Sequence, residues 1–167
     1  MSYKLLLLGQ YIPFEIIESK IDRKPKIFFG KKITLIVYKD SNINKILYDW
    51  YREYCYNVVK NRTEFYSELI NKKPREIKIK NQKTIWGSCS SKNRLNFCWK
   101  IILLPIELLN YIVIHEMCHL VHFNHSKNFW SCLGEIIPDY NERIKEIKIW
   151  EKKIFELGDF IKHEKIT

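Results

Sequence analysis

Apolar and polar residues alternate in short runs over the first 40 residues, a pattern that predicts β-strands. Gly9, Pro25 and Gly30 interrupt these runs at points where turns are expected. Because the runs are short and close together, we expect each strand to pair with its chain neighbour in a meander of hairpins. The predicted strands are Lys4–Leu8, Tyr11–Glu18, Lys26–Phe29 and Lys32–Tyr38.

The apolar spacing becomes helical after residue 40. Asn42 or Asn44 can cap a long helix that continues to about Ile70, since Asn side chains accept hydrogen bonds at helix N-termini. We expect its apolar stripe to pack into the core rather than to stack on nucleic-acid bases. The stripe consists of Leu47, Tyr51, Tyr54, Val58 and Phe65.

Alternation returns after Pro74. It predicts strands at Glu76–Lys80 and Arg94–Ile102, with a loop at Gly87–Asn93 between them. The segment Pro105–Phe123 is apolar on nearly every side, which predicts a buried helix.

Two further helices are expected near the end of the chain. Ser126 can cap a short helix that ends at about Ile136. Asp139 and Glu142 have the spacing of a capping box in which Asp is the cap, so a final helix is predicted from there to about Leu157.

Length and composition indicate one folded domain. A chain of 167 residues can bury a substantial core, and 46% hydrophobic residues with 14% aromatics exclude a disordered chain. We divide the predicted domain into a β-rich part with its helix, residues 1–72, and a second part, residues 74–157.

The net charge of +10 raises the possibility of a nucleic-acid or acidic partner. However, only 6 of the 29 basic residues are Arg, and the lysines are scattered along the chain. We therefore expect lysines on solvated surfaces and only weak, non-specific nucleic-acid binding.

The five cysteines form no Cys-x-x-Cys pair, and their number is odd. Reduced thiols explain this better than a disulfide framework, which predicts a cytoplasmic protein. The apolar run Leu5–Leu8 is too short for a signal peptide, and no segment approaches the length of a membrane span.

Four of the five histidines lie between His115 and His125. The run begins with His-Glu-x-x-His, and helix positions i and i+4 share one face, so His115 and His119 can reach the same metal ion. Glu116 is placed to polarise a water on that metal. A carboxylate and several imidazoles inside a buried helix are costly unless paired or bound to metal, which favours a metal site.

Two histidines compete for the position of third ligand. His122 shares the helix face, but a helix rises about 1.5 Å per residue, which places it roughly 10 Å along the axis from His115. His125 follows Asn124, a residue that tolerates the left-handed conformation that ends helices, so a turn there could return His125 to the ion. The role of His122 then stays open. It could contact a metal ligand, donate a hydrogen bond to the transition state, or be a polar residue at the helix end.

Two segments carry a family resemblance. The run HEMCHLVHFNHSKNFW, from His115 to Trp130, resembles the YgjP-like zinc metallopeptidases, relatives of the SprT-like zincins. The run WGSCSSKNRLN, from Trp86 to Asn96, resembles the WGSCSSxGRLN segment of that family. The likeness is strong over about residues 74–157 and loose before them. Asn93 replaces the usual Gly, but Asn also permits a positive φ.

The resemblance implies an α+β, zincin-like fold: N-terminal β-hairpins and a small mixed sheet pack on helices, and the metal site lies on the buried helix. Residues 74–157 are then the catalytic core. The resemblance also implies one Zn²⁺ per chain, with another divalent transition metal possible, and a peptide or unfolded protein as the substrate. The implied ligands are His115, His119 and His125, with Glu116 as the catalytic residue.

Several residues are candidates for supporting roles. An edge strand, Arg94–Trp99 or its partner, would pair with an extended peptide by analogy with zincins. Trp86 and Arg94 could line that cleft or equally brace the loop. The second donor to the oxyanion would be His122, Tyr140 or Arg143. The carboxylates available to orient the metal-binding imidazoles are Glu135, Asp139 and Glu142.

Two other function classes are weighed against the peptidase. The same chemistry could serve a metal-dependent nucleotide pyrophosphatase, but no Gly-rich phosphate loop or acidic magnesium cluster is visible. A basic nucleic-acid-associated protease or binding module would suit the charge. Structural zinc sites usually fill four positions with protein ligands, whereas three imidazoles beside a Glu leave one open, which favours catalysis.

Overall fold

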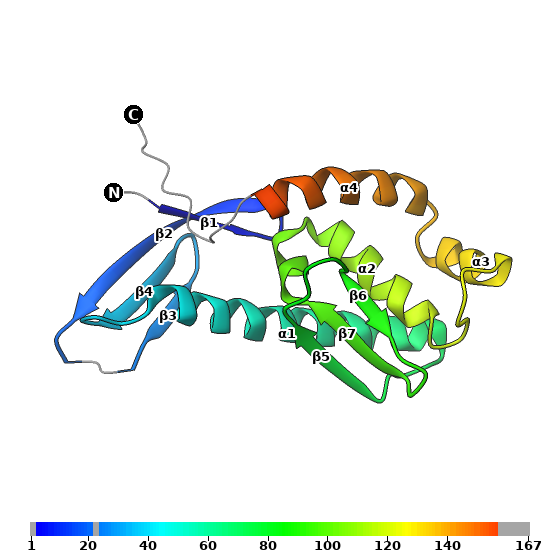
Figure 1. Ribbon diagram of the computed structural model, residues 1–167, viewed down its shortest axis with the longest axis horizontal. Coiled ribbons are helices and arrows are strands. Elements are labelled where there is room, and N and C mark those ends of the chain that lie inside the picture. Colours follow the sequence, from blue (N-terminus) through cyan, green and yellow to red (C-terminus); the bar gives the residue numbers. More distant parts are fainter. Residues whose placement is uncertain (1–2, 22–23, 157–167) are drawn as a thin grey trace.

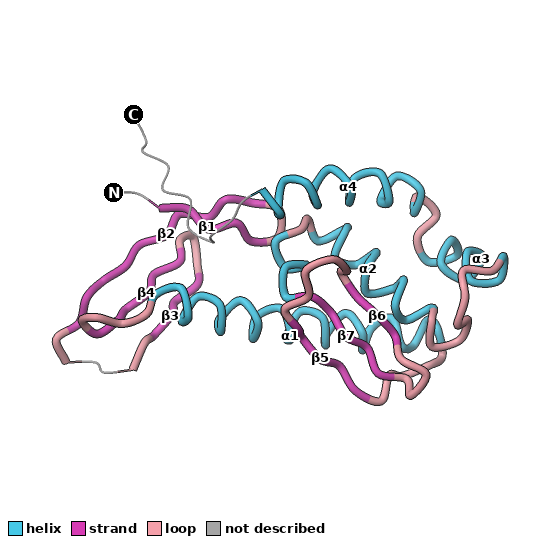
Figure 2. Tube along the Cα trace, viewed as in Figure 1, coloured by secondary structure: helices cyan, strands magenta, loops and turns pink. Residues whose placement is uncertain are grey.

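The structure is a computed structural model that describes residues 3–21 and 24–156. Within them, two small mixed sheets and four α-helices form the α+β fold that we expected. Figure 1 shows the two sheets at opposite ends of the long helix α1 (Ile43–Ile70), and Figure 2 shows the loops that join the elements. The remaining helices gather around the second sheet, which is the end that holds the histidines.

The first sheet has the strand order β1-β2-β4-β3. Its strands are β1 (Tyr3–Leu7), β2 (Gln10–Ser19), β3 (Lys26–Phe29) and β4 (Ile33–Tyr38). β1 and β2 form a hairpin, but β2 pairs with β4 in parallel, so the predicted meander is wrong. Burial explains why β4, and not β3, pairs with β2. Alternate residues of β4 are buried, which suits an inner strand, whereas β3 exposes Phe28 and Phe29 and lies at the edge.

Helix α1 begins after Asn42, whose side chain accepts a hydrogen bond from the backbone N–H of Lys45 at 3.0 Å. It ends at Asn71, whose φ of 52° is left-handed. Its 28 residues extend about 42 Å at 1.5 Å per residue, enough to reach both sheets. The predicted stripe is correct at its start and wrong at its end, where Phe65 is exposed and its neighbour Tyr66 is buried instead.

The second sheet consists of β5 (Glu76–Lys80), β7 (Arg94–Cys98) and β6 (Gly87–Cys89), with β7 in the middle. The predicted strand to Ile102 is too long, because the chain turns at Trp99 into the 3-10 helix η1 (Trp99–Leu103). The predicted loop contains the short edge strand β6. Asn93 has a φ of 55°, the left-handed conformation that we expected it to permit.

Helix α2 (Ile106–Cys118) is buried along most of its length and packs against α1, α4 and β6. It ends five residues before the predicted end at Phe123. Tight turns replace the helical pattern from Leu120, whose N–H bonds to the carbonyl of Met117. Asn124 is not left-handed, so the predicted turn chemistry there is wrong.

Two helices follow, α3 (Lys127–Ile136) and α4 (Tyr140–Glu156). Both helices start at the expected positions, but Ser126 makes no side-chain capping hydrogen bond. The N–H of Glu142 bonds to the backbone carbonyl of Asp139, whose carboxylate pairs with Arg143 instead, so the predicted capping box is wrong. The predicted end of the last helix, Leu157, lies outside the described residues. In residues 3–21 and 24–156, no helix is both long and apolar enough to cross a membrane.

Candidate metal centre

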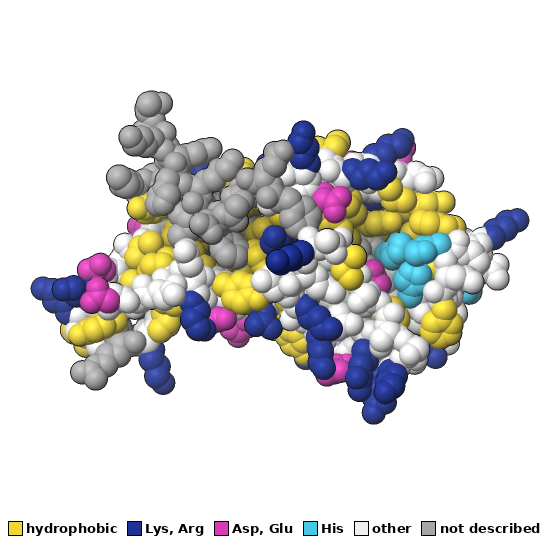
Figure 3. All heavy atoms as spheres, in the orientation of Figure 1, with side chains coloured by type: hydrophobic (Ala, Val, Ile, Leu, Met, Phe, Trp, Pro, Cys, Tyr) yellow, Lys and Arg dark blue, Asp and Glu magenta, His cyan; other side chains and the backbone are white. Residues whose placement is uncertain are grey.

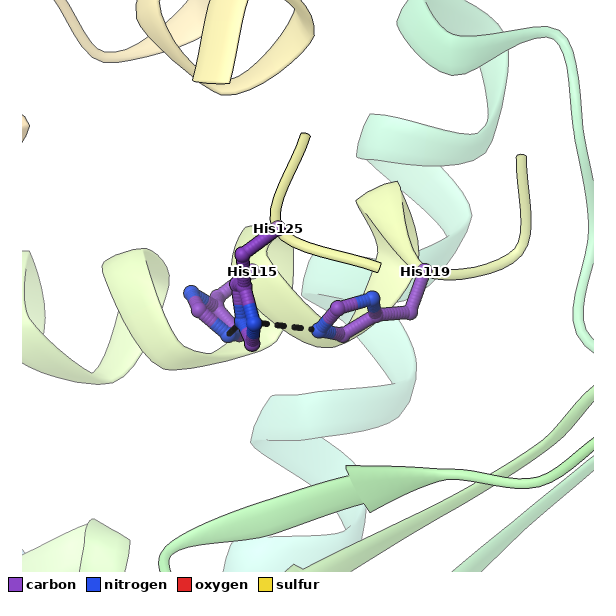
Figure 4. A group of neighbouring side chains, drawn as sticks. All are labelled: His115, His119 and His125. Carbon is purple, nitrogen blue, oxygen red and sulfur yellow. Dashed lines mark hydrogen bonds between the residues drawn. The ribbon is translucent and has the colours of Figure 1, made fainter. Parts of the chain in front are cut away.

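Three imidazoles converge where α2 ends and the chain turns back toward α3 (Figure 4). Nε2 of His125 lies 3.0 Å from Nε2 of His115 and 3.2 Å from Nε2 of His119. One ligand atom from each of the three residues falls within 4.8 Å of the others. His115 and His119 are half-buried, and His125 is exposed, so the cluster opens to solvent. Figure 3 shows it as a surface patch bordered by hydrophobic side chains.

The spacing of these nitrogens fits a zinc ion. Two nitrogens bound tetrahedrally at 2.0–2.1 Å from zinc are about 3.3 Å apart, close to the separations found here. Three imidazoles are also a usual ligand set of catalytic zinc, which leaves its fourth position to water or substrate. The residues present therefore fit the ion that the sequence implies.

The other ring nitrogens have oxygen partners that set their protonation. Nδ1 of His119 lies 2.9 Å from the backbone carbonyl of His122, so it carries the proton and Nε2 keeps its lone pair. Nδ1 of His115 lies 3.4 Å from the hydroxyl of Tyr111. The carbonyl is one of the two kinds of partner expected for a metal-binding imidazole, and neither partner is one of the three candidate carboxylates.

Those carboxylates lie elsewhere. The Asp139 carboxylate pairs with Arg143 at 2.6 Å, and Glu142 lies 3.9 Å from Lys145. Glu135 is exposed and lines a separate cavity. Tyr111 was missed by the sequence analysis, although its position four residues before His115 on a helix was a usable signal.

An aromatic layer supports the cluster from α3. The ring of Phe129 is fully buried and lies 4.5 to 4.9 Å from each of the three imidazoles, measured between ring centroids. Trp130 stacks on His125 at 5.6 Å, and Tyr140 stacks on the other side of Trp130 at 5.3 Å. This packing restricts the rings to few orientations, so the nitrogens are held together before a metal binds.

Burial also controls the charge of the ligands. Burial, reinforced by the neighbouring imidazoles, lowers the pKa of His115 to about 4. Burial lowers the pKa of His119 as well. Neutral imidazole is the form that binds metal, so at neutral pH these two rings do not have to release a proton first.

Glu116 occupies the inner side of the site, next to His115 on α2, and is only 8% exposed. Burial raises the pKa of its carboxyl group to about 7. A cation held by the imidazoles would lower that pKa again, because an opposite charge favours the carboxylate. Glu116 is thus a buried acid–base group with a proton affinity suited to neutral solution.

Gly87, on the edge strand β6, leaves the space that Glu116 fills. A Cβ at this position would lie 2.7 Å from Cγ and 3.0 Å from Oε1 of Glu116. Both atoms belong to a side chain that can rotate, so a larger residue would displace the carboxylate rather than break the fold. The sequence analysis named Gly87 only as the start of a loop and missed this contact.

We predict that Gly87→Ala lowers kcat for peptide hydrolysis at least about 10-fold, because a carboxylate moved by an ångström no longer reaches its proton. Zinc content and melting temperature should change little. The matched control is Gly30→Ala, since nothing lies within 4 Å of a Cβ added there. Equal kcat values for the two variants at full zinc occupancy would contradict the proposed role of this contact.

The remaining candidates divide into two groups. Trp86 lines a cavity with His115 and Glu116, as expected for the cleft, and Tyr140 stacks in the aromatic layer. Arg94 pairs with Glu76 at 3.3 Å, joins β7 to β5, and is not among the residues that line this cavity.

Arg143 and His122 do not serve the cluster as donors in this structure. The guanidinium of Arg143 is held by Asp139 and lies 3.5 Å from Glu146 on its own helix. The side chain of His122 lines a separate cavity with α3 residues, and only its backbone carbonyl reaches the metal cluster.

The buried Glu116 and the three imidazoles that converge at the end of α2 have the composition expected of a metallopeptidase site. The family model of the YgjP-like metallopeptidase domain matches residues 2–149, and the chain belongs to that family. It is a zinc metallopeptidase. This assignment does not favour the nucleotide pyrophosphatase that we weighed as an alternative.

A solved structure supports the fold over about half of the chain. The metallopeptidase zymogen of Pyrococcus abyssi abylysin is similar with a TM-score of 0.50 and 22% sequence identity. The match covers 53% of this chain and 90% of the abylysin chain. No curated protein sequence matches the chain.

Proposed function

We propose that His115, His119 and His125 hold the zinc ion and that Glu116 is the general base of peptide-bond hydrolysis. The convergence of three Nε2 atoms beside this buried carboxylate is the observation that carries the proposal. His115 and Glu116 belong to α2, His119 is its C-cap residue, and His125 comes from the turn that follows, so one helix end organises the chemistry.

Bound zinc supplies Lewis acidity, which lowers the pKa of water and polarises the scissile carbonyl. Glu116 accepts the proton of the attacking water and later donates it to the leaving amine. Burial raises the pKa of this carboxyl group, and a bound cation would lower it, so the two effects oppose each other. The backbone oxygen of His122 keeps His119 in the tautomer that presents Nε2.

Of the three candidates for a second donor to the oxyanion, we retain Tyr140. Its ring stacks on Trp130, which stacks in turn on His125, so a hydroxyl donor lies on the same aromatic layer as the ligands. Arg143 is occupied by acidic neighbours, and His122 faces another cavity.

We propose an extended peptide or a segment of unfolded protein as the substrate, lying along β6. This strand is at the edge of its sheet, packs on α2 and includes the Gly87 contact with Glu116. Main-chain hydrogen bonds to an edge strand recognise an extended chain with little regard to its sequence. We also propose a cytoplasmic location, which the five free cysteines support.

Zinc-loaded protein should cleave an unstructured protein and leave nucleoside triphosphates intact. The products would be measured by mass spectrometry and by phosphate release, with a chelator-treated sample as control. Cleavage should disappear with the chelator and return when zinc is added. Release of pyrophosphate or phosphate without peptide cleavage would contradict the proposal.

A further inference from the structure

A cavity of about 330 Å³ adjoins the proposed catalytic group between α2, α4 and the segment before β6. His115 and Glu116 form part of its wall. Half of its other lining residues are large and apolar: Ile85, Trp86, Ile112, Ile144 and Ile147. The proposed hydrolysis gives this part of the cleft no role in choosing the substrate.

We propose that this cavity is a specificity pocket, which receives a large apolar side chain of the substrate next to the scissile bond. The inference rests on the proposed peptidase function and adds the class of residue at which the enzyme cleaves. Large apolar side chains, such as Leu, Met and Phe, are preferred over Ala and over charged residues at one substrate position.

The first argument is the position of the cavity beside the proposed catalytic residue and a proposed zinc ligand. A wall that contains both His115 and Glu116 lies beside the reacting carbonyl, so a side chain in the cavity belongs to a residue at or next to that carbonyl. Gly87 also lines the cavity and begins the edge strand β6. Successive side chains of a strand point to opposite faces, so only one of two neighbouring substrate residues can enter.

The chemistry of the wall is the second argument. Five large apolar side chains make burial of a substrate hydrocarbon favourable, because apolar surface leaves water on both sides. The volume exceeds what a single Ala side chain can fill, so a small residue would leave contacts unmade.

The mostly apolar wall disfavours a charged occupant, because a charged side chain that leaves water without a partner loses its hydration energy. Lys148 and Glu151 of α4 also line the cavity and contribute one charge of each sign, hence no net charge.

The direct test is digestion of a peptide library by zinc-loaded enzyme, with cleavage sites determined by mass spectrometry. We expect Leu, Met or Phe at one position beside the bond to be favoured about 10-fold or more over Ala, Lys and Glu, the discrimination typical of an apolar pocket. A flat profile, or a preference for Lys or Arg at that position, would overturn the proposal.

Substitutions at Ile144, a half-buried wall residue, link the preference to this cavity. Ile144→Trp fills the pocket and should shift the preference toward Ala, whereas Ile144→Ala enlarges it and should shift it toward Phe and Trp. The matched control is Ile149→Trp on the same helix, since Ile149 is 71% exposed and lies outside the pocket wall. An unchanged profile in both Ile144 variants would overturn the assignment, even if one of them folds poorly.

A binding measurement separates failure of the pocket from failure of the proposed function. The probes are fluorescein-labelled, Ala-rich hexapeptides with a central Leu, Ala or Lys, added to zinc-loaded Glu116→Gln protein. At least about 10-fold tighter binding of the Leu peptide would support the pocket even if wild-type enzyme cleaves nothing. Equal affinities would overturn the pocket and leave the hydrolytic role of Glu116 to its own test.

Discussion

The Glu116→Gln variant is expected to retain zinc and to lose peptide hydrolysis by at least about 10²–10⁴-fold, the usual contribution of general acid–base catalysis. Gln keeps the shape of the side chain but cannot accept the proton of the attacking water. The proposed zinc ligands are three imidazoles, none of which is altered by this substitution. The measurement is kcat/KM on a peptide that the wild type cleaves, at matched zinc occupancy.

The same variant should be no less stable than the wild type without metal. Glu116 is 8% exposed and its pKa is raised by burial, so ionising it inside the fold is unfavourable, and a neutral amide avoids that cost. Melting temperatures of the two metal-free proteins at pH 8 would be compared as the folding control. Equal hydrolysis rates with equal zinc content would mean that the general base lies elsewhere.

Removal of the third proposed ligand should have the second large effect, on metal affinity. His125→Ala takes away an Nε2 atom that lies within 3.2 Å of both neighbouring ligand nitrogens. Loss of a residue that hydrogen-bonds a metal ligand already lowers metal affinity about 10–100-fold. Loss of a ligand itself should cost more, so we expect zinc affinity to fall more than about 100-fold. The dissociation constant for zinc would be measured by competition with a chromophoric chelator.

His122→Ala is the matched control for this prediction. The substitution removes a side chain that lines a different cavity and preserves the backbone carbonyl that accepts from His119. Its zinc affinity should stay within a few-fold of the wild type. If His122→Ala releases the metal and His125→Ala retains it, the ligand assignment is wrong.

The N-terminal strands show what local pattern can and cannot predict. Their positions were predicted to within a few residues, because alternation and turn residues are local properties. Their order was not, because a ten-residue β2 can pair with either β3 or β4 as judged by its own sequence. Burial decided the pairing: β4, with Ile33, Leu35 and Val37 in the core, gains more in the middle of the sheet than at its edge.

The end of α2, at the candidate metal centre, also shows what a local sequence pattern cannot predict. Apolar residues continue to Phe123, so the local pattern predicted a longer helix. In the fold, Val121 and Phe123 are exposed, and the turn that begins at Leu120 lets the His122 carbonyl bind His119 and brings His125 back. The choice of His125 over His122 was argued from axial rise along a helix that ends earlier than expected. In the fold, the turns after Cys118 bring His125 to His115 and His119.

The sequence by itself determined which residues are candidates for the site: His-Glu-x-x-His puts His115 and His119 on one helix face, and a third His follows six residues later. The tertiary structure alone decided what surrounds them. Phe129 under the imidazoles, Gly87 against Glu116 and the cavity beneath α4 all join segments that are distant along the chain. Such contacts follow from how α2, α3, α4 and β6 pack together, and no local period of the sequence encodes that packing.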